Sequence, residues 1–270
     1  MVAGPRTFAG LFLVTLATLL DEILLTRIFS VATWYHFAFL AISVAMFGMT
    51  VGAIAVYVFR KAFSEEKTRR HLALAALLFG VSLALGFLAQ IRIPFSTDLS
   101  PGALAGNAAI FLLSAVPFGF SGVCVCLALT RFPRQVGRLY AADLAGASAA
   151  CVAVIYLLKI TDGPTAMIGT AALAAAGAVC FARDAADARL VRVSALSAAV
   201  LFGCAAVHTV FVWNQAPVVR LRSVKGTVEN RPLYEKWNSF SRIRVRPSPT
   251  ANPLGWGLSQ AFRPRHPVRQ

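Results

Sequence analysis

The chain has few charged residues and lacks the short motifs that mark common soluble enzymes. Asp, Glu, Lys and Arg make up 14% of its 270 residues, and only 11 residues are acidic. No glycine-rich phosphate loop, GxGxxG, HExxH or CxxC pair occurs. These residues alone therefore indicate no nucleotide-binding fold, no zinc protease and no visible catalytic centre.

Cysteine is scarce as well, with five in the whole chain. All five fall within apolar segments and lack the spacing of a metal site. We interpret them as small core residues, and they leave the redox compartment undetermined.

Apolar sequence, in contrast, is abundant. Hydrophobic residues make up 58% of the chain, and the mean hydropathy is +0.69. A helix rises about 1.5 Å per residue, so about 20 apolar residues cross a hydrocarbon layer of about 30 Å. Seven stretches approach or exceed that length, the first interrupted by Asp21 and Glu22. The predicted spans are 7–29, 33–59, 72–89, 107–130, 140–158, 165–182 and 193–213.

The basic residues of the apolar part predict which side of the membrane its connectors occupy. They cluster in connectors 60–71, 131–138 and 183–192, whereas the intervening connectors hold only Arg92 and Lys159. Short loops rich in Lys and Arg stay in the cytoplasm, so these three connectors and the N-terminus are predicted to be cytoplasmic. Alternation then sends the C-terminal tail outward, although the tail is strongly basic. A last span that re-enters or does not cross would place the tail inside, and the sequence leaves both arrangements open.

The segment after Trp213 has a different chemistry. Its only acidic residues are Glu229 and Glu235, against many Lys and Arg. Segments 217–222 and 241–246 alternate between apolar and basic residues, which predicts half-buried strands, with Ile243 on one face and Arg242 on the other. We therefore predict an all-α membrane protein, a polytopic bundle of about seven transmembrane helices (1–213), followed by a short basic strand and loop tail (214–270). The tail is too short to build a core, so we expect the chain to be part of a longer protein.

Charged residues inside a membrane are costly and invite a functional interpretation. Asp143 is one candidate, with Tyr140, Gly146 and Ala147 on its helical face. It locks neighbouring helices, serves transport or ligand binding, or lies at the membrane interface near Arg138. Asp21 and Glu22 form a second candidate site, unless Arg27 pairs with them or they lie at the membrane boundary.

Two histidines and a glycine pattern complete the candidates. His208 lies inside the last span, whereas His36 follows Trp34 and Tyr35 and is interpreted as part of an aromatic belt. A pair of axial haem ligands formed by the two histidines is conceivable but weakly indicated. Gly48 and Gly52 form a GxxxG pattern, and with Gly119 and Gly122 beside Pro117 they predict close helix packing.

Three segments resemble the membrane-embedded, spermidine synthase-like family of multispanning bacterial proteins. They are LLTRIFSVATWYHFAFLAIS (24–43), PFGFSGVCVCLALTRFPRQVGRLYAADLAGA (117–147), and YEKWNSFSRIRV (234–245) with NPLGWGLS (252–259). The resemblance implies that 234–245 begins a strand-rich segment leading to a Rossmann-like domain. That domain would bind S-adenosylmethionine or its decarboxylated form, but the chain stops before the cofactor motif, so no cofactor-binding or catalytic residue is carried over.

Two functions follow as expectations. In the first, the chain is the membrane domain of a spermidine synthase-like protein in the bacterial inner membrane and anchors a transferase domain that acts on a small amine. In the second, it is a transporter-like module for a polyamine or another small cation, with Asp143 and Asp21 or Glu22 facing a cavity. In both, the lipid bilayer is the partner, and the high pI of about 10.7 is not taken to indicate nucleic acid. Substrate and oligomeric state are not readable.

Overall fold

The computed structural model describes residues 2–33, 37–245, 249–250 and 268–269. Its described part contains seven helices long and apolar enough to cross a membrane, which confirms the predicted number. They are α1 (Pro5–Ala32), α2 (Ala38–Val58), α3 (Thr68–Gln90), α4 (Pro101–Thr130), α5 (Val136–Ile160), α6 (Gly163–Asp184) and α7 (Ala188–Trp213). The short 3-10 turns η2 (Glu65–Lys67) and η3 (Pro133–Gln135) precede α3 and α5.

Several helices begin at residues whose side chains satisfy their first amides. Ser100, Asp162 and Asp187 each accept a hydrogen bond from the backbone N–H three residues later, at the starts of α4, α6 and α7. Such caps replace the intrahelical partners that a first turn lacks. The sequence marks these starts with a polar residue directly before each apolar run.

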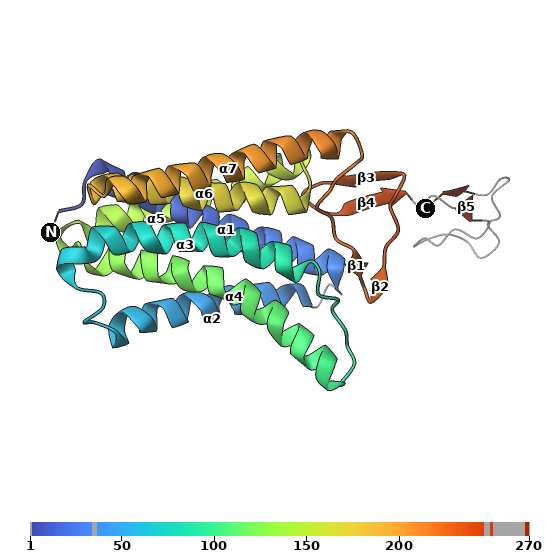
Figure 1. The fold of residues 1–270 in the computed structure, drawn as a ribbon, viewed down its shortest axis with the longest axis horizontal. Coiled ribbons are helices and arrows are strands. Elements are labelled where there is room, and N and C mark those ends of the chain that lie inside the picture. Colours follow the sequence, from blue (N-terminus) through green and yellow to red (C-terminus); the bar gives the residue numbers. More distant parts are fainter. Residues whose placement is uncertain (1, 34–36, 246–248, 251–267, 270) are drawn as a thin grey trace.

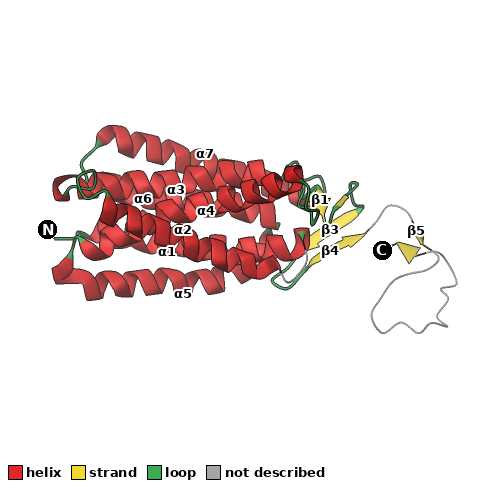
Figure 2. Ribbon diagram, turned by 90° about the horizontal axis from the view of Figure 1, so that it is seen from below, coloured by secondary structure: helices red, strands yellow, loops and turns green. Residues whose placement is uncertain are grey.

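Four helices form the centre of the bundle and three lie outside. Helices α1, α3, α4 and α6 pack against one another, while α2 packs on α4, α5 on α1, and α7 on α6 (Figure 2). The outer helices keep much of their apolar surface exposed, as expected for helices in contact with lipid. The first part of α4 diverges from the bundle in Figure 1, as expected for a helix with Pro117 in its interior.

The predicted glycine packing is present between α2 and α4. A β-carbon at Gly52 would collide with the carbonyl oxygen of Gly119, and one at Gly122 would collide with Met49. Only a hydrogen at these positions lets the two backbones approach this closely.

The bundle has two chemically different ends. The N-terminus lies beside the three basic connectors, where the backbone N–H of Ala3 donates to Gln135 Oε1 at 2.6 Å and Arg69 donates to the carbonyl of Val2 at 3.1 Å. Helix α7 is continuous and runs beside α6, so the tail leaves at the opposite end (Figure 1). We call these the N-terminal end and the tail end. Helix α7 contains no re-entrant turn within the described residues.

The described part of the tail consists of small antiparallel hairpins. They pair β1 (Ser223–Val224) with β2 (Thr227–Val228), β3 (Tyr234–Trp237) with β4 (Arg242–Val245), and β5 (Pro249–Thr250) with β6 (Val268–Arg269). Gly226, at φ +75°, occupies the turn of the first hairpin, where a left-handed backbone favours glycine.

Two expectations about the tail need correction. Segment 217–222 forms no strand, because the backbone N–H groups of Val218 and Val219 bond to His208 instead of a neighbouring strand. The segment predicted at 241–246 does form a strand, β4, but its buried face is the basic one. Ile243 is 49% exposed, whereas the Arg242 side chain is 5% exposed because two glutamates pair with it.

Candidate functional site

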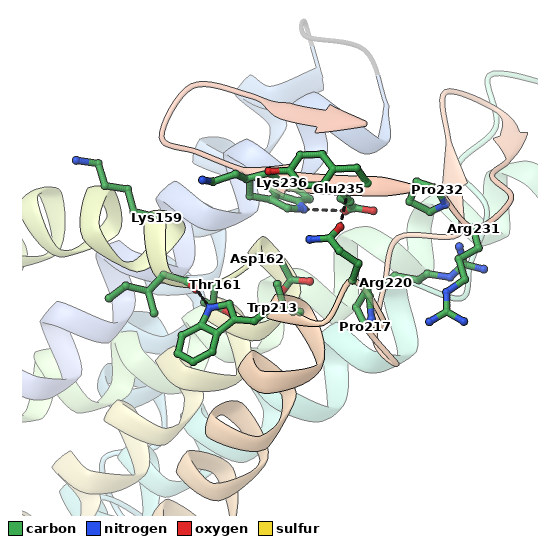
Figure 3. Close-up of a pocket in the computed structure, with 15 residues that line it drawn as sticks. Lys159, Thr161, Asp162, Trp213, Pro217, Arg220, Arg231, Pro232, Glu235 and Lys236 are labelled. Carbon is green, nitrogen blue, oxygen red and sulfur yellow. Dashed lines mark hydrogen bonds between the residues drawn. The ribbon is translucent and has the colours of Figure 1, made fainter. Parts of the chain in front are cut away.

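A pocket of about 390 Å³ lies where the tail meets the ends of α5, α6 and α7. Figure 3 shows its lining side chains, which come from the α5–α6 connector, the end of α7, the segment after it, and β3. The pocket combines aromatic residues with charges of both signs. Its charged and aromatic lining residues are Lys159, Asp162, Trp213, Arg220, Arg231, Tyr234, Glu235, Lys236 and Trp237.

A chain of hydrogen bonds runs from the base of this pocket to the segment after α7. Thr165 Oγ1 donates to Asp162 Oδ1 and is 2.7 Å from His208 Nδ1. On the other side of the ring, His208 Nε2 accepts from the backbone N–H groups of Val218 at 3.1 Å and Val219 at 2.9 Å. Amides only donate, so Nε2 carries no proton and His208 is the neutral tautomer protonated on Nδ1.

These hydrogen bonds give His208 a positioning role. Both ring nitrogens are used, one for α6 and one for the tail, so the ring fixes the tail segment against the bundle. His36, the proposed second haem ligand, lies outside the described residues, and His208 has no free nitrogen for iron in this arrangement. The described residues contain no group of three or more His, Cys, Asp or Glu side chains that could hold a metal ion.

The hairpin of β3 and β4 contains a buried ionic cluster. Arg242 binds both carboxylate oxygens of Glu235, at 2.8 and 2.9 Å, and also contacts Glu229 at 2.9 Å. Arg244 pairs with Glu229 at 2.9 Å. Burial alone would raise the pKa of Glu235, but hydrogen bonds and charge from Arg242 outweigh it and hold the pKa below its usual value. This bidentate pairing between Arg242 on β4 and Glu235 on β3 ties the two strands of the hairpin together.

Trp237 joins this hairpin to the bundle. The side chain is buried, and its Nε1–H donates to Glu235 Oε1 at 2.9 Å. The indole lies against Gly163 in the first turn of α6, where a β-carbon would be 3.0 Å from Trp237 Cζ3. The contact links the segment predicted to begin the strand-rich part directly to the bundle.

Asp162 lies beneath the pocket and is almost fully buried. Desolvation raises its pKa to about 6, although the hydrogen bonds from Thr165 work in the opposite direction. Glu235 is committed to Arg242, so the remaining lining charges are mostly positive: Lys159, Arg220, Arg231 and Lys236. The open side of the pocket therefore favours an anionic group over a cationic one.

The candidate acids of the membrane part lie apart from this pocket and apart from one another. Asp21 is 2% exposed in the centre of the bundle, and its Oδ2 has no hydrogen-bond partner among the described residues. Glu22 is half-buried. Neither forms an ion pair with Arg27, so the pairing considered from the sequence is not formed within the described part of the chain.

Asp143 and Tyr140 lie on the outer helix α5. Asp143 is half-buried and Tyr140 is 52% exposed. The carbonyl of Asp143 accepts from Thr15 Oγ1 at 3.1 Å, and a β-carbon at Gly146 would collide with α1. The expected close approach of a helix beside Asp143 is therefore present, but it comes from the backbone and Gly146.

The sequence-based reasoning missed Asp162, Thr165, Glu235 and Arg242 as a connected group. One signal was available: Asp162 followed by Gly163, Pro164 and Thr165 is a helix-start pattern. The contact with His208 could not be found this way, because it joins residues on two different helices.

Comparison with known proteins adds no relative. No family model, curated protein or solved structure matches this chain.

Proposed function

We propose that this chain is an integral membrane domain of the bacterial inner membrane that holds an extramembrane, spermidine synthase-like transferase domain at its tail end. The carrying observation is that the tail is docked: Trp237 packs on Gly163 and His208 holds the amides of Val218 and Val219. The β3–β4 hairpin, which carries YEKWNSFSRIRV, is thereby fixed to the bundle and provides a rigid start for a following domain.

The chemistry proposed for that domain is transfer of an aminopropyl or methyl group from a sulfonium donor to a small amine. Its support is the sequence resemblance together with the hairpin formed by the resembling segment. In this proposal, S-adenosylmethionine or its decarboxylated form binds outside the present 270 residues. Titration of the full-length protein with either compound by calorimetry should give saturable binding, and absence of heat with both would remove the transferase part.

Sidedness provides a sharper test, because the N-terminus and the tail lie at opposite ends. Lys and Arg in the short connectors favour a cytoplasmic N-terminus. A cytoplasmic sulfonium donor instead requires a cytoplasmic tail, and both cannot hold in this bundle. Reporter fusions at the N-terminus and at Gln270 should therefore give opposite locations. A cytoplasmic tail supports the transferase proposal, whereas a cytoplasmic N-terminus leaves the docked platform without access to that donor.

A second candidate function is transport of a polyamine or another small cation. The observation that favours it is Asp21, a buried carboxyl in the centre of the bundle whose Oδ2 has no partner within the described part of the chain. If this function is right, Asp21→Asn should abolish cation uptake into vesicles at unchanged expression. Asp143→Asn tests the other acid expected to face a cavity, the one on the outer helix α5. Unchanged uptake with both variants would remove the transporter proposal.

A further inference from the structure

Asp21 borders a small space between the central helices of the bundle. The space is about 10 Å³, which is room for about one water molecule or one small ion. It is lined by residues of α1, α3, α4 and α6, among them Gln90, Leu113, Ser114 and Pro117. Oδ2 of Asp21 is buried here without a hydrogen-bond partner in the described structure.

Residues with oxygen-bearing side chains from two other helices, Gln90 and Ser114, line the same space. Gln90 Oε1 on α3 accepts from Ser114 Oγ on α4 at 2.7 Å, and both residues line the cavity. Pro117 also lines it and has no backbone N–H, so the carbonyl of Leu113, one turn earlier, loses its helical partner. That carbonyl faces Gly86 on α3, where a β-carbon would be 2.9 Å away. The residues that carry a carboxylate, an amide oxygen, a hydroxyl and this carbonyl thus all line one space.

This group resembles the chemistry of a hard cation site. Carboxylate, carbonyl and hydroxyl oxygens suit small hard cations, and carbonyls released from a helix serve this purpose in membrane proteins. Among the described residues, no Lys, Arg or His lines the cavity, so these residues offer Asp21 no counter-charge there. An isolated carboxylate in a membrane interior is costly, and the space is too small for a polyamine.

We propose that Asp21, Gln90, Ser114 and the Leu113 carbonyl bind one Na⁺ ion in this cavity. When the ion leaves, a proton on Asp21 takes its place, so that the site stays neutral in both states. Binding of one Na⁺ to the protonated site therefore releases one proton. This inference does not depend on the transferase-anchoring function. It shares with the transporter proposal only the idea that Asp21 binds a cation, and it does not require that the cation be transported.

The other ionisable groups near this site are few. Glu22 is adjacent to Asp21 on α1, and Asp143 lies on α5, where its carbonyl accepts from Thr15 of α1. The lining residues from α3, α4 and α6 carry no ionisable side chain. Proton competition with Na⁺ is therefore expected to depend on Asp21.

The test is the thermal stability of the purified protein in detergent, titrated with NaCl at ionic strength kept constant with choline chloride. We expect the Tm to rise with Na⁺ and saturate, because an ion bound only by the folded state at 100 times its Kd raises the folded-to-unfolded ratio about 100-fold. The rise should be smaller at lower pH. In weak buffer, addition of NaCl should acidify the solution.

Three variants separate binding from general stability. Asp21→Asn should lose both the Na⁺-dependent rise and the proton release, while Glu22→Gln, the adjacent and half-buried control, should behave like the wild type. Pro117→Ala restores an N–H for the Leu113 carbonyl and should raise the Na⁺ concentration at half-saturation by about tenfold. It tests the site even if Asp21→Asn does not fold.

Three outcomes would overturn the proposal. If the wild-type Tm does not change when Na⁺ replaces choline, the cavity holds only water. An Asp21→Asn variant that keeps the Na⁺ response, or an unchanged half-saturation in Pro117→Ala, would place the ion elsewhere. A positive result without any uptake would retain the ion site and remove the transporter function.

Discussion

The indole of Trp237 covers Gly163, the first residue of α6, and this contact attaches the β3–β4 hairpin to the helical bundle. A strand residue and a helix residue far apart in the sequence meet because the glycine leaves room for an aromatic ring. Replacing either partner should loosen the tail without unfolding the bundle.

Gly163→Val tests this contact directly. The added side chain must displace the indole, and overpacking of this kind costs about 1–3 kcal/mol. We expect Trp237 to become more exposed, which would be measured as a red shift in tryptophan emission and faster proteolysis after α7, with unchanged helical circular dichroism. Gly203→Val is the matched control, because a β-carbon at Gly203 has no contact within 4 Å. Equal proteolysis of both variants would contradict the docking contact.

His208→Phe should release the segment that follows α7. Removing the imidazole leaves the N–H groups of Val218 and Val219 without their acceptor, at a cost of about 1–3 kcal/mol for each group left buried. Hydrogen exchange of these two amides should accelerate. His208→Gln offers a carbonyl acceptor and should partly restore protection, whereas equal exchange in both variants would argue against the hydrogen-bonding role.

Asp162 should make the tail end less stable as the pH rises. Its folded-state pKa of about 6 exceeds the ordinary value of 3.8, so the folded protein binds this proton more tightly than the unfolded chain. The stabilisation is complete below about pH 4 and is lost as the pH passes 6, a difference of about 3 kcal/mol. Asp162→Asn keeps an oxygen for the α6 cap and should be more stable than the wild type at pH 7.

The measurement for Asp162 is denaturant unfolding between pH 4.5 and 7. Glu235 has the opposite sign, since its lowered pKa makes its contribution decline only as the pH falls below the ordinary value of 4.5. Above that value, the difference between the wild-type and Asp162→Asn slopes reports on Asp162. An Asp162→Asn variant with the same slope as the wild type would show that another group titrates.

Arg242→Met should destabilise the β3–β4 hairpin strongly. The substitution leaves the buried carboxylates of Glu229 and Glu235 without their shared partner, and breaking a buried ion pair costs about 3–5 kcal/mol. Loss of Trp237 burial would report the effect by fluorescence. Lys236→Met, on the same hairpin but exposed, is the control, and equal effects of the two substitutions would contradict the role of the cluster.

The glycines of α2 and α4 show which parts of the packing were predictable. The GxxxG pattern at Gly48 and Gly52 predicted close approach, and the structure places these residues against Gly119 and Phe118 of α4. The pattern worked because the absence of a side chain is a local property. The sequence did not identify α4 as the partner helix, since every span offers a similar apolar surface.

The candidate acids show where prediction from sequence stops. The sequence favoured Asp143 over Asp21 because small residues share its helical face, yet Asp21 is in the centre and Asp143 is on an outer helix. Which face of each helix turns inward depends on its neighbours in space.

By itself, the sequence determined the seven apolar helices, their approximate bounds and the change to strands after Trp213, because these follow from the length and period of apolar runs. Only the tertiary structure decided that the tail lies opposite the N-terminus, that His208 fastens it, and that the arginine face of β4 is buried. Each of these depends on contacts between distant residues, where Glu229, Glu235 and Thr165 supply partners that a local pattern cannot reveal.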